Sequence, residues 1–415
     1  MQKQVTTAFD IEALRADFPI LHQFHHGEVS LIYLDSAASS QKPVQVLDAM
    51  DTYYRSIHSN VHRGIHKLSE AATEAYEGSR NKIKAFINAS NRREIIFTRG
   101  TTESINLVAQ TWGRQNLGPD DTVISTVMEH HANIVPWQML AAERGFSVRY
   151  IGLQEDGTLN LDEYGRLLAD GRVKLVVVTH CSNVLGTVNP VAEMARMAHD
   201  AGALILVDGA QSIPHMPVDV RALDVDFFAF SSHKMLGPTG IGVLYGKRAV
   251  LENMPPWMGG GDMIARVTLE NSTWNELPYK FEAGTPSVAE GIGFGTAIEY
   301  LKQIGMDTIQ AHADSLTRYA LECLSEIPQV NIIGAAGERG SLVSFTIDGI
   351  HPHDAAQLLD NDGIAIRAGH HCAMPLHDRL QIPASVRASF AVYNTREEID
   401  ALAVSVRRAI KLYSA

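Results

Sequence analysis

A lysine and an aspartate follow two apolar segments that a parallel sheet would bring side by side. Asp208 ends the apolar run 204–208, and Lys234 lies shortly after the run 227–231. A lysine amine can bond to an aldehyde as a Schiff base, while a buried carboxylate keeps a pyridine nitrogen protonated. The pair therefore predicts a site for pyridoxal 5'-phosphate (PLP). A lysine after an apolar strand is more often a solvated loop residue, so the prediction depends on its surroundings.

Hydroxyl and glycine residues that suit a phosphate group follow two of the apolar segments. The segment 95–98 leads into Arg99-Gly100-Thr101-Thr102, and Ser231 and His233 precede the lysine. A glycine and threonine turn at a helix start offers backbone N–H groups and hydroxyls to an anion, with help from the helix dipole. An ordinary helix cap has the same composition. Several such elements in one chain favour a phosphate site.

Cys372 is the third group with chemistry of its own. It follows Arg367, His370 and His371 closely. Cationic neighbours favour a thiolate over a thiol, so this cysteine is the predicted nucleophile. His370, His371 and Cys372, together with His377, are alternatively metal ligands. Adjacent residues on a strand point to opposite faces and no second cluster has a familiar zinc spacing, so we expect no metal.

Composition limits the class of protein. The chain has 415 residues and a formal net charge of −12, with no basic stripe of the kind that binds nucleic acid. No apolar run approaches the ~20 residues that cross a bilayer, and Met1–Thr7 lacks the apolar core of a secretory signal. Cys181 and Cys323, which we interpret as small buried residues, form no disulfide framework with Cys372. We expect a cytoplasmic protein without nucleic-acid or membrane partners.

Short apolar segments alternate with helical patterns through the first three quarters of the chain. We expect strands at 95–98, 122–126, 175–179, 204–208, 227–231 and 241–245, with helices such as 189–201 between them. This alternation predicts an α/β fold with a mainly parallel sheet and helices on both faces. Ligands of such sheets lie beyond the carboxyl ends of the strands. From about Met306 a long helix, strands at 342–347, 364–367 and 386–391, and a final helix at 396–413 predict a smaller α+β domain.

Six strings of the sequence resemble one family of enzymes. They are Leu34-Asp35-Ser36-Ala37-Ala38, Arg99-Gly100-Thr101-Thr102-Glu103, Glu129-His130-His131-Ala132-Asn133, Ser182-Asn183-Val184-Leu185-Gly186, Ser231-Ser232-His233-Lys234 and Arg367-Ala368-Gly369-His370-His371-Cys372-Ala373. Together they resemble a cysteine desulfurase of the SufS type (group II), within the class V aminotransferase-like PLP family. The resemblance implies PLP fold-type I with a seven-stranded-type central sheet. It also implies three parts: an N-terminal segment (1–25) packing on the small domain, a large PLP-binding domain (26–305) and a small α+β domain (306–415) carrying the cysteine.

The resemblance also implies a role for individual residues. Cys372, Lys234 and His130 are the expected catalytic residues, with His130 stacking over the pyridine ring. Expected cofactor ligands are Lys234, Asp208, Gln211, Ser231, His233, Thr101, Thr102, His130 and, donated across a dimer interface, Thr285. Expected substrate ligands are Arg387, which would grip the substrate carboxylate, with Asn183, His62 and Arg367.

The activity implied by the resemblance is removal of sulfur from L-cysteine. The products would be L-alanine and a persulfide on Cys372, passed to a SufE- or SufU-type acceptor for iron–sulfur cluster assembly, and selenocysteine is a second candidate substrate. Only a short stretch separates Arg367 from Cys372, so we predict a constrained loop and weak turnover without an acceptor. A homodimer is expected. The alternatives are a related PLP enzyme, such as a cysteine sulfinate desulfinase or a transaminase, and a non-catalytic metal-binding scaffold.

Overall fold

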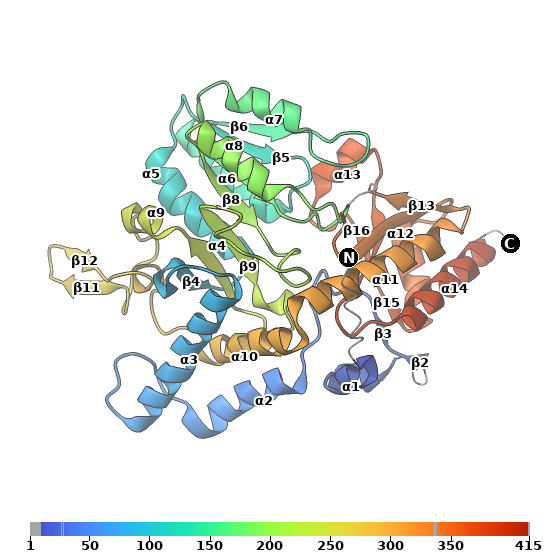
Figure 1. Cartoon of the computed structure of the whole chain (residues 1–415), viewed down its shortest axis with the longest axis horizontal. Helices are drawn as coiled ribbons and strands as arrows, with labels where there is room; N and C mark the ends of the chain where they lie inside the picture. The colour runs from blue at the N-terminus through green and yellow to red at the C-terminus, as the bar shows by residue number, and fades with distance from the viewer. Residues whose placement is uncertain (1–9, 26, 28, 335–337, 414–415) are drawn as a thin grey trace, which may run out of the picture.

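A seven-stranded sheet forms the centre of the computed structural model, which describes residues 10–25, 27, 29–334 and 338–413 (Figure 1). The strand order is β4-β10-β9-β8-β7-β5-β6. The strands are β4 (Ile95–Thr98), β5 (Thr122–Thr126), β6 (Ser147–Ile151), β7 (Val173–Thr179), β8 (Leu204–Asp208), β9 (Phe227–Ser231) and β10 (Gly242–Gly246). β10 runs antiparallel to its two neighbours, β4 and β9, and the other strand pairs of this sheet are parallel. The predicted α/β fold with a mainly parallel sheet is confirmed.

Both faces of this sheet are buried, because alternate residues of each strand point to opposite sides. Val176 and Val178 pack into one apolar cluster, whereas Leu175 and Val177 pack into another. The first cluster includes helices α3 (Lys67–Phe86), α7 (Leu161–Leu168), α8 (Val191–Asp200) and α10 (Val288–Ile304). The second includes α4 (Thr101–Val108), α6 (Val135–Arg144) and α9 (Arg248–Asn253). The helices therefore hold the sheet rigidly and leave its strand ends to carry functional groups.

A second, antiparallel sheet forms the C-terminal part of the molecule, at the right of Figure 1. Its order is β13-β14-β17-β16, with bounds β13 (Val330–Ile333), β14 (Leu342–Ile347), β16 (Arg367–Gly369) and β17 (Ser385–Ser389). A separate apolar cluster joins this sheet to α11 (Met306–Ser325), α12 (Pro352–Asp360) and α14 (Arg396–Tyr413). Gly305, at φ +90°, separates α10 from α11 close to the predicted domain boundary. The division into domains itself stays a prediction.

The strand predicted at 364–367 is wrong as a single element. β15 (Ile364–Ala365) pairs in parallel with β3 (Ile32–Tyr33), and β16 then pairs with β17 in the antiparallel sheet. The chain changes sheets at Ile366, and only long-range pairing decides this. The switch carries the segment that follows β16 toward the large sheet.

The remaining elements lie around these two sheets. They are α1 (Ile11–Ala16), α2 (Val44–Thr52), α5 (Arg114–Asn116), α13 (Met374–Leu380), β1 (Phe24–His25), β2 (Val29–Ser30), β11 (Ile264–Val267) and β12 (Ser272–Trp274). Arg15 of α1 donates to Glu398 at 2.9 Å, so α1 contacts the start of α14. Residues 1–9 of the predicted N-terminal segment lie outside the described residues. No helix in the described part is long and apolar enough to cross a membrane.

Candidate active site

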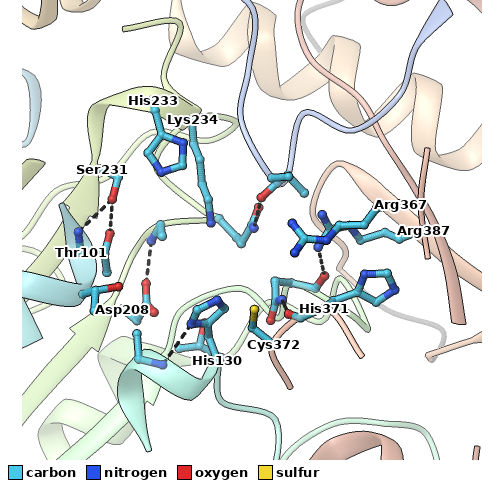
Figure 2. A pocket seen from close by; sticks show the side chains of 18 residues that line it. Thr101, His130, Asp208, Ser231, His233, Lys234, Arg367, His371, Cys372 and Arg387 are labelled. Atoms are coloured by element: carbon cyan, nitrogen blue, oxygen red, sulfur yellow. Dashed lines mark hydrogen bonds between the residues drawn. The ribbon is translucent and has the colours of Figure 1, made fainter. Parts of the chain in front are cut away.

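The carboxyl ends of the parallel strands meet at one cavity (Figure 2). All the residues predicted for the site line it except His62 and Thr285: Thr101, Thr102, His130, Asn183, Asp208, Gln211, Ser231, His233, Lys234, Arg367, Cys372 and Arg387. The small sheet supplies Arg367 and Arg387, and the loop after β16 supplies Cys372. Lys234 and Cys372 therefore border the same cavity, although they follow strands of two different sheets.

Asp208 and Lys234 are both deeply buried in this cavity. The Asp208 carboxylate accepts a hydrogen bond from the backbone N–H of Ala210 at 2.9 Å and is 5% exposed. Burial raises the pKa of Asp208 even though that hydrogen bond and the charge of Lys234 oppose it. Burial also lowers the pKa of Lys234 to about 8, against the attraction of Asp208. A larger fraction of the amine is therefore neutral, and able to react with an aldehyde, than in an ordinary lysine.

One end of the cavity suits a phosphate group. The backbone N–H of Thr101, the first residue of α4, donates to Ser231 Oγ at 2.8 Å, and the two hydroxyl oxygens lie 2.7 Å apart. The turn before α4 packs tightly on β10, because a Cβ at Gly242 would lie 2.5 Å from the Cα of Gly100. This close approach brings a helix N-terminus with its hydroxyl groups next to Ser231 and Lys234.

His130 presents a defined nitrogen to the cavity. Its Nδ1 accepts a hydrogen bond from the backbone N–H of Ala132 at 3.1 Å, so Nδ1 carries no proton and the neutral ring carries its hydrogen on Nε2. Burial, reinforced by the charge of Lys234, lowers the pKa of His130 to about 4. Near neutral pH this side chain is therefore a hydrogen donor through Nε2.

The loop that carries Cys372 is fixed at several points. Asn183 Nδ2 donates to the carbonyl of His371 at 2.6 Å, and the backbone N–H of His131 donates to the carbonyl of Cys372 at 2.7 Å. His371 and Cys372 both have positive φ, +50° and +58°, which is uncommon for residues with a side chain. Such backbone persists only where neighbouring groups hold it. The predicted constrained loop agrees with this geometry.

Arg387 is held by two of its five N–H donors. Its Nη1 donates to the carbonyl of Asn183 at 3.0 Å and its Nη2 to Asp35 Oδ1 at 3.1 Å. Its Nε is buried and has no partner among the described residues. Arg367 faces Arg387 across the β16–β17 pairing, so two guanidinium groups border the same part of the cavity. This part suits an anionic group such as a carboxylate.

The expectation of a cationic His371 beside Cys372 is wrong. His371 is 4% exposed, and burial together with the charge of Arg387 lowers its pKa to about 2. The sequence could not show this burial, because it results from packing against β17. The positive charges bordering the cavity come from Arg367, Arg387 and Lys234. His371 lines the cavity as a neutral residue, and sequence reasoning did not assign it to the site.

His62 and Thr285 lie away from this cavity within one chain. His62 Nε2 is 3.0 Å from Glu77 Oε1, and the ring lines a separate hollow with Arg63 and Tyr279. Thr285 lines another hollow beside Trp257. A role in a neighbouring copy's site, as predicted for Thr285, remains a prediction.

A family model described as Aminotransferase class-V matches residues 32–402. The chain belongs to the aminotransferase class-V family. The chain is 51% identical to a cysteine desulfurase of Haloferax volcanii, over 100% of both chains. It is 50% identical to a cysteine desulfurase of Escherichia coli K12, over 97% of this chain and 99% of the relative. The crystal structure of the E. coli cysteine desulfurase CsdA superimposes with a TM-score of 0.91 at 41% identity, covering 97% of this chain and 99% of the other.

Members of the class-V family are PLP-dependent, and the residues of this chain fit that cofactor. A buried carboxylate, a buried amine with a lowered pKa and a helix N-terminus with hydroxyl groups lie around one cavity. Gln211 lines the same cavity. One of its amide hydrogens already bonds to the carbonyl of Ala37 at 2.8 Å, which leaves the other for a ligand. The assignment to the SufS-type subgroup within the family remains a prediction.

Proposed function

We propose that this protein is a PLP-dependent cysteine desulfurase. The observation that carries the proposal is the placement of Cys372 in the same cavity as Lys234 and Arg387. A transaminase needs an amine and a carboxylate-binding arginine, but it has no use for a constrained cysteine facing them. Relatives at about half identity over the full chain carry this activity in their names.

The residues divide the work of binding between them. Arg387 would bind the substrate carboxylate through its remaining Nη hydrogens, with Arg367 beside it. Thr101, Thr102, Ser231 and His233 would hold the phosphate, Asp208 the pyridine nitrogen and Lys234 the aldehyde carbon. When bound, PLP supplies an electron sink for the bonds at the substrate's Cα.

The side chains then move protons and sulfur. Lys234 Nζ, whose burial favours the neutral amine, takes the proton from Cα. The Cys372 thiolate attacks the substrate sulfur: the S–S bond forms as the Cβ–S bond breaks, and alanine is completed by one proton added to Cβ and by the return of a proton from Lys234 to Cα. His130 holds a hydrogen at Nε2 and is placed to donate it. The persulfide remains on Cys372.

The biological setting is part of the proposal. We infer a homodimer, transfer of sulfur to a SufE- or SufU-type acceptor for iron–sulfur cluster assembly, use of selenocysteine as well as cysteine, and a cytoplasmic location. The fixed loop supports an external acceptor, because a persulfide held by the contacts around Cys372 cannot swing far from the cavity. Alanine release should therefore rise when such an acceptor is added, and no response to either acceptor type would count against this part.

Mass spectrometry after incubation with L-cysteine tests the main claim. We expect one additional sulfur on Cys372 and alanine in solution, both lost in Cys372→Ser. Cys323→Ala is the matched control and should keep both, because Cys323 lies outside the cavity. Lys234→Ala should also lose the visible absorbance of the bound cofactor. A persulfide on Cys181 or Cys323 alone, or alanine release by Cys372→Ser at the wild-type rate, would overturn the proposal.

A further inference from the structure

Glu129, directly before His130, carries a carboxyl group that is fully buried at the end of the parallel sheet. It is 0% exposed and is not among the residues that border the cavity. Its Oε1 accepts the hydroxyl hydrogen of Thr126 at 2.7 Å and the backbone N–H of Thr179 at 2.9 Å. Thr126 ends β5 and Thr179 ends β7, so this one oxygen joins the ends of two strands. A carboxyl group is expensive to bury, and no step of the proposed reaction uses this one.

The other oxygen of Glu129 is held by a hydrogen bond of defined direction. Its Oε2 accepts from Asn133 Nδ2 at 2.6 Å. Trp137 Nε1 lies 3.3 Å from Asn133 Oδ1, and an indole nitrogen only donates. This contact decides which end of the Asn133 amide faces Glu129. Hydrogens therefore point in one direction along the row, from Trp137 to Asn133 to Glu129.

The requirement for an acceptor at Oε2 does not depend on the charge of Glu129. Burial raises the pKa of Glu129 to about 8, while the hydrogen bonds from Thr126, Thr179 and Asn133 oppose that shift. A hydrogen on Oε2 would meet the N–H of Asn133, so any proton on this side chain would lie on Oε1. Oε2 is an acceptor in either protonation state.

The segment held by Glu129 carries two groups that act at the cavity. His130 borders the cavity, as Cys372 does (Figure 2). The backbone N–H of His131 donates to the carbonyl of Cys372 at 2.7 Å. Both histidines lie between Glu129 and Asn133, and a short 3-10 helix runs from His131 to Asn133. The bond between Glu129 and Asn133 therefore closes the segment that presents His130 and holds the Cys372 loop.

The same side chain sets this segment against the strand next to Asp208. Thr179 is the partner of Asp208 in the parallel β7–β8 pair, and both residues border the cavity. Because Glu129 accepts the N–H of Thr179, the segment is fixed to the strand end beside the buried aspartate. The places of His130 and Cys372 relative to Asp208 thus depend on a side chain outside the cavity.

We propose that Glu129 is a positioning residue that sets His130 and the Cys372 loop against the end of the parallel sheet. This inference rests on the proposed function, in which His130 donates a hydrogen and Cys372 takes the sulfur. Glu129 itself touches no reacting atom. Its neighbours require two acceptor oxygens, so the polarity of the group matters and not only its size.

The first test is Glu129→Gln in the protein with its cofactor bound. The change keeps the size of the side chain but puts an NH2 group in place of one oxygen. That group meets Asn133 Nδ2 in one orientation and the backbone N–H of Thr179 in the other. We expect kcat for alanine release to fall about tenfold, while KM for L-cysteine changes less than roughly twofold because Arg387 is untouched. Iodoacetamide should modify Cys372 several-fold faster.

A second substitution should restore the site by reversing the hydrogen bond. In Glu129→Gln/Asn133→Asp the new amide at position 129 donates to the new carboxylate at position 133, which still accepts from Trp137. Side-chain volume and net charge stay as in the wild type. We expect kcat and the rate of Cys372 modification to return to within about threefold of the wild-type values. Asn133→Asp alone brings two carboxyl groups together and should be impaired.

Glu398→Gln is the matched control for loss of a buried carboxylate. Glu398 Oε2 accepts from Asn394 Nδ2 at 2.7 Å and from the backbone N–H of Thr395 at 3.2 Å, outside the cavity. Glu398→Gln should lower the midpoint of urea unfolding, as Glu129→Gln does. It should leave kcat and the modification of Cys372 unchanged, because Glu398 does not hold the segment that carries His130.

The outcomes distinguish this inference from the proposed function. Wild-type kcat and Cys372 modification in Glu129→Gln, losses that the double variant does not restore, or equal losses in Glu398→Gln would overturn the inference and leave the desulfurase proposal standing. A wild-type protein that released no alanine would overturn the proposed function. Faster modification of Cys372 in Glu129→Gln, restored in the double variant, would then still support the positioning of the loop by Glu129.

Discussion

His131 donates its backbone N–H to the carbonyl of Cys372 at 2.7 Å, and this bond joins the segment after β5 to the loop after β16. The His131 side chain adds a second link, because its Nε2 accepts the backbone N–H of Met374 at 3.0 Å. One residue that follows a strand of the large sheet thus holds the chain at Cys372 and at Met374. The two parts of the molecule meet at the proposed nucleophile.

Removal of the His131 side chain should loosen this loop. In His131→Phe the N–H of Met374 loses its acceptor, worth about 1 kcal/mol. We expect iodoacetamide to modify Cys372 several-fold faster and alanine release to slow by about tenfold. The control is His22→Phe, an exposed histidine outside the cavity. Unchanged labelling of Cys372 in His131→Phe would show that the backbone contacts alone hold the loop.

Uptake of PLP by the apoprotein should depend on pH through Lys234. Only the neutral amine attacks an aldehyde, and burial lowers the pKa of Lys234 to about 8. The rate of cofactor binding, followed by absorbance, should rise with pH and level off above about 8 rather than near the ordinary value of about 10.4. A rate that keeps rising steeply to pH 10 would contradict the lowered pKa.

The same lowered pKa predicts how the stability of the apoprotein changes with pH. Between pH 8 and the ordinary pKa of lysine, the unfolded chain binds a proton at Lys234 that the folded chain has released. The contribution of Lys234 to the free energy of unfolding therefore increases as pH rises through this window. Urea titrations of apoprotein and of Lys234→Met should differ in slope against pH there. Parallel curves would contradict this linkage.

The carboxylate-binding role of Arg387 is tested by Arg387→Lys. Lysine keeps the charge but lacks the planar fork, so the contacts to the carbonyl of Asn183 and to a carboxylate cannot both be kept. We expect KM for L-cysteine to rise by about tenfold or more, with a smaller change in kcat. A fall in kcat at constant KM would instead place Arg387 at the reacting atoms.

Retention of the cofactor should depend on Ser231. Its oxygen accepts the N–H of Thr101 and pairs with the Thr101 hydroxyl, so Ser231→Ala disturbs the helix N-terminus that would hold the phosphate. We expect the dissociation constant for PLP to rise about tenfold, measured after dialysis. Ser232→Ala is the matched control, because the Ser232 hydroxyl is buried without a partner in the described structure and lies outside the cavity. Equal losses in both variants would refute the phosphate role.

Much of the large sheet was predictable because its strands are short apolar runs with polar groups at their ends. The bounds 204–208 and 227–231 match β8 and β9, so Asp208 and Ser231 fall at strand ends as expected. Burial on both faces produces such runs, and the parallel arrangement then gathers their ends at one edge. The strand at 364–367 failed, because pairing with β3 and β17 divides it and neither partner is local.

The sequence by itself determined which groups are available: an amine, a carboxylate, hydroxyls at a helix start and a thiol near two arginines, each recognisable from its neighbours along the chain. Only the tertiary structure decided that Cys372 reaches the cavity of Lys234, that His371 is buried, and that His62 and Thr285 lie elsewhere. The physical reason is that proximity and burial depend on contacts between distant segments. Charge and tautomer follow from that burial, and the identity of a residue does not reveal them.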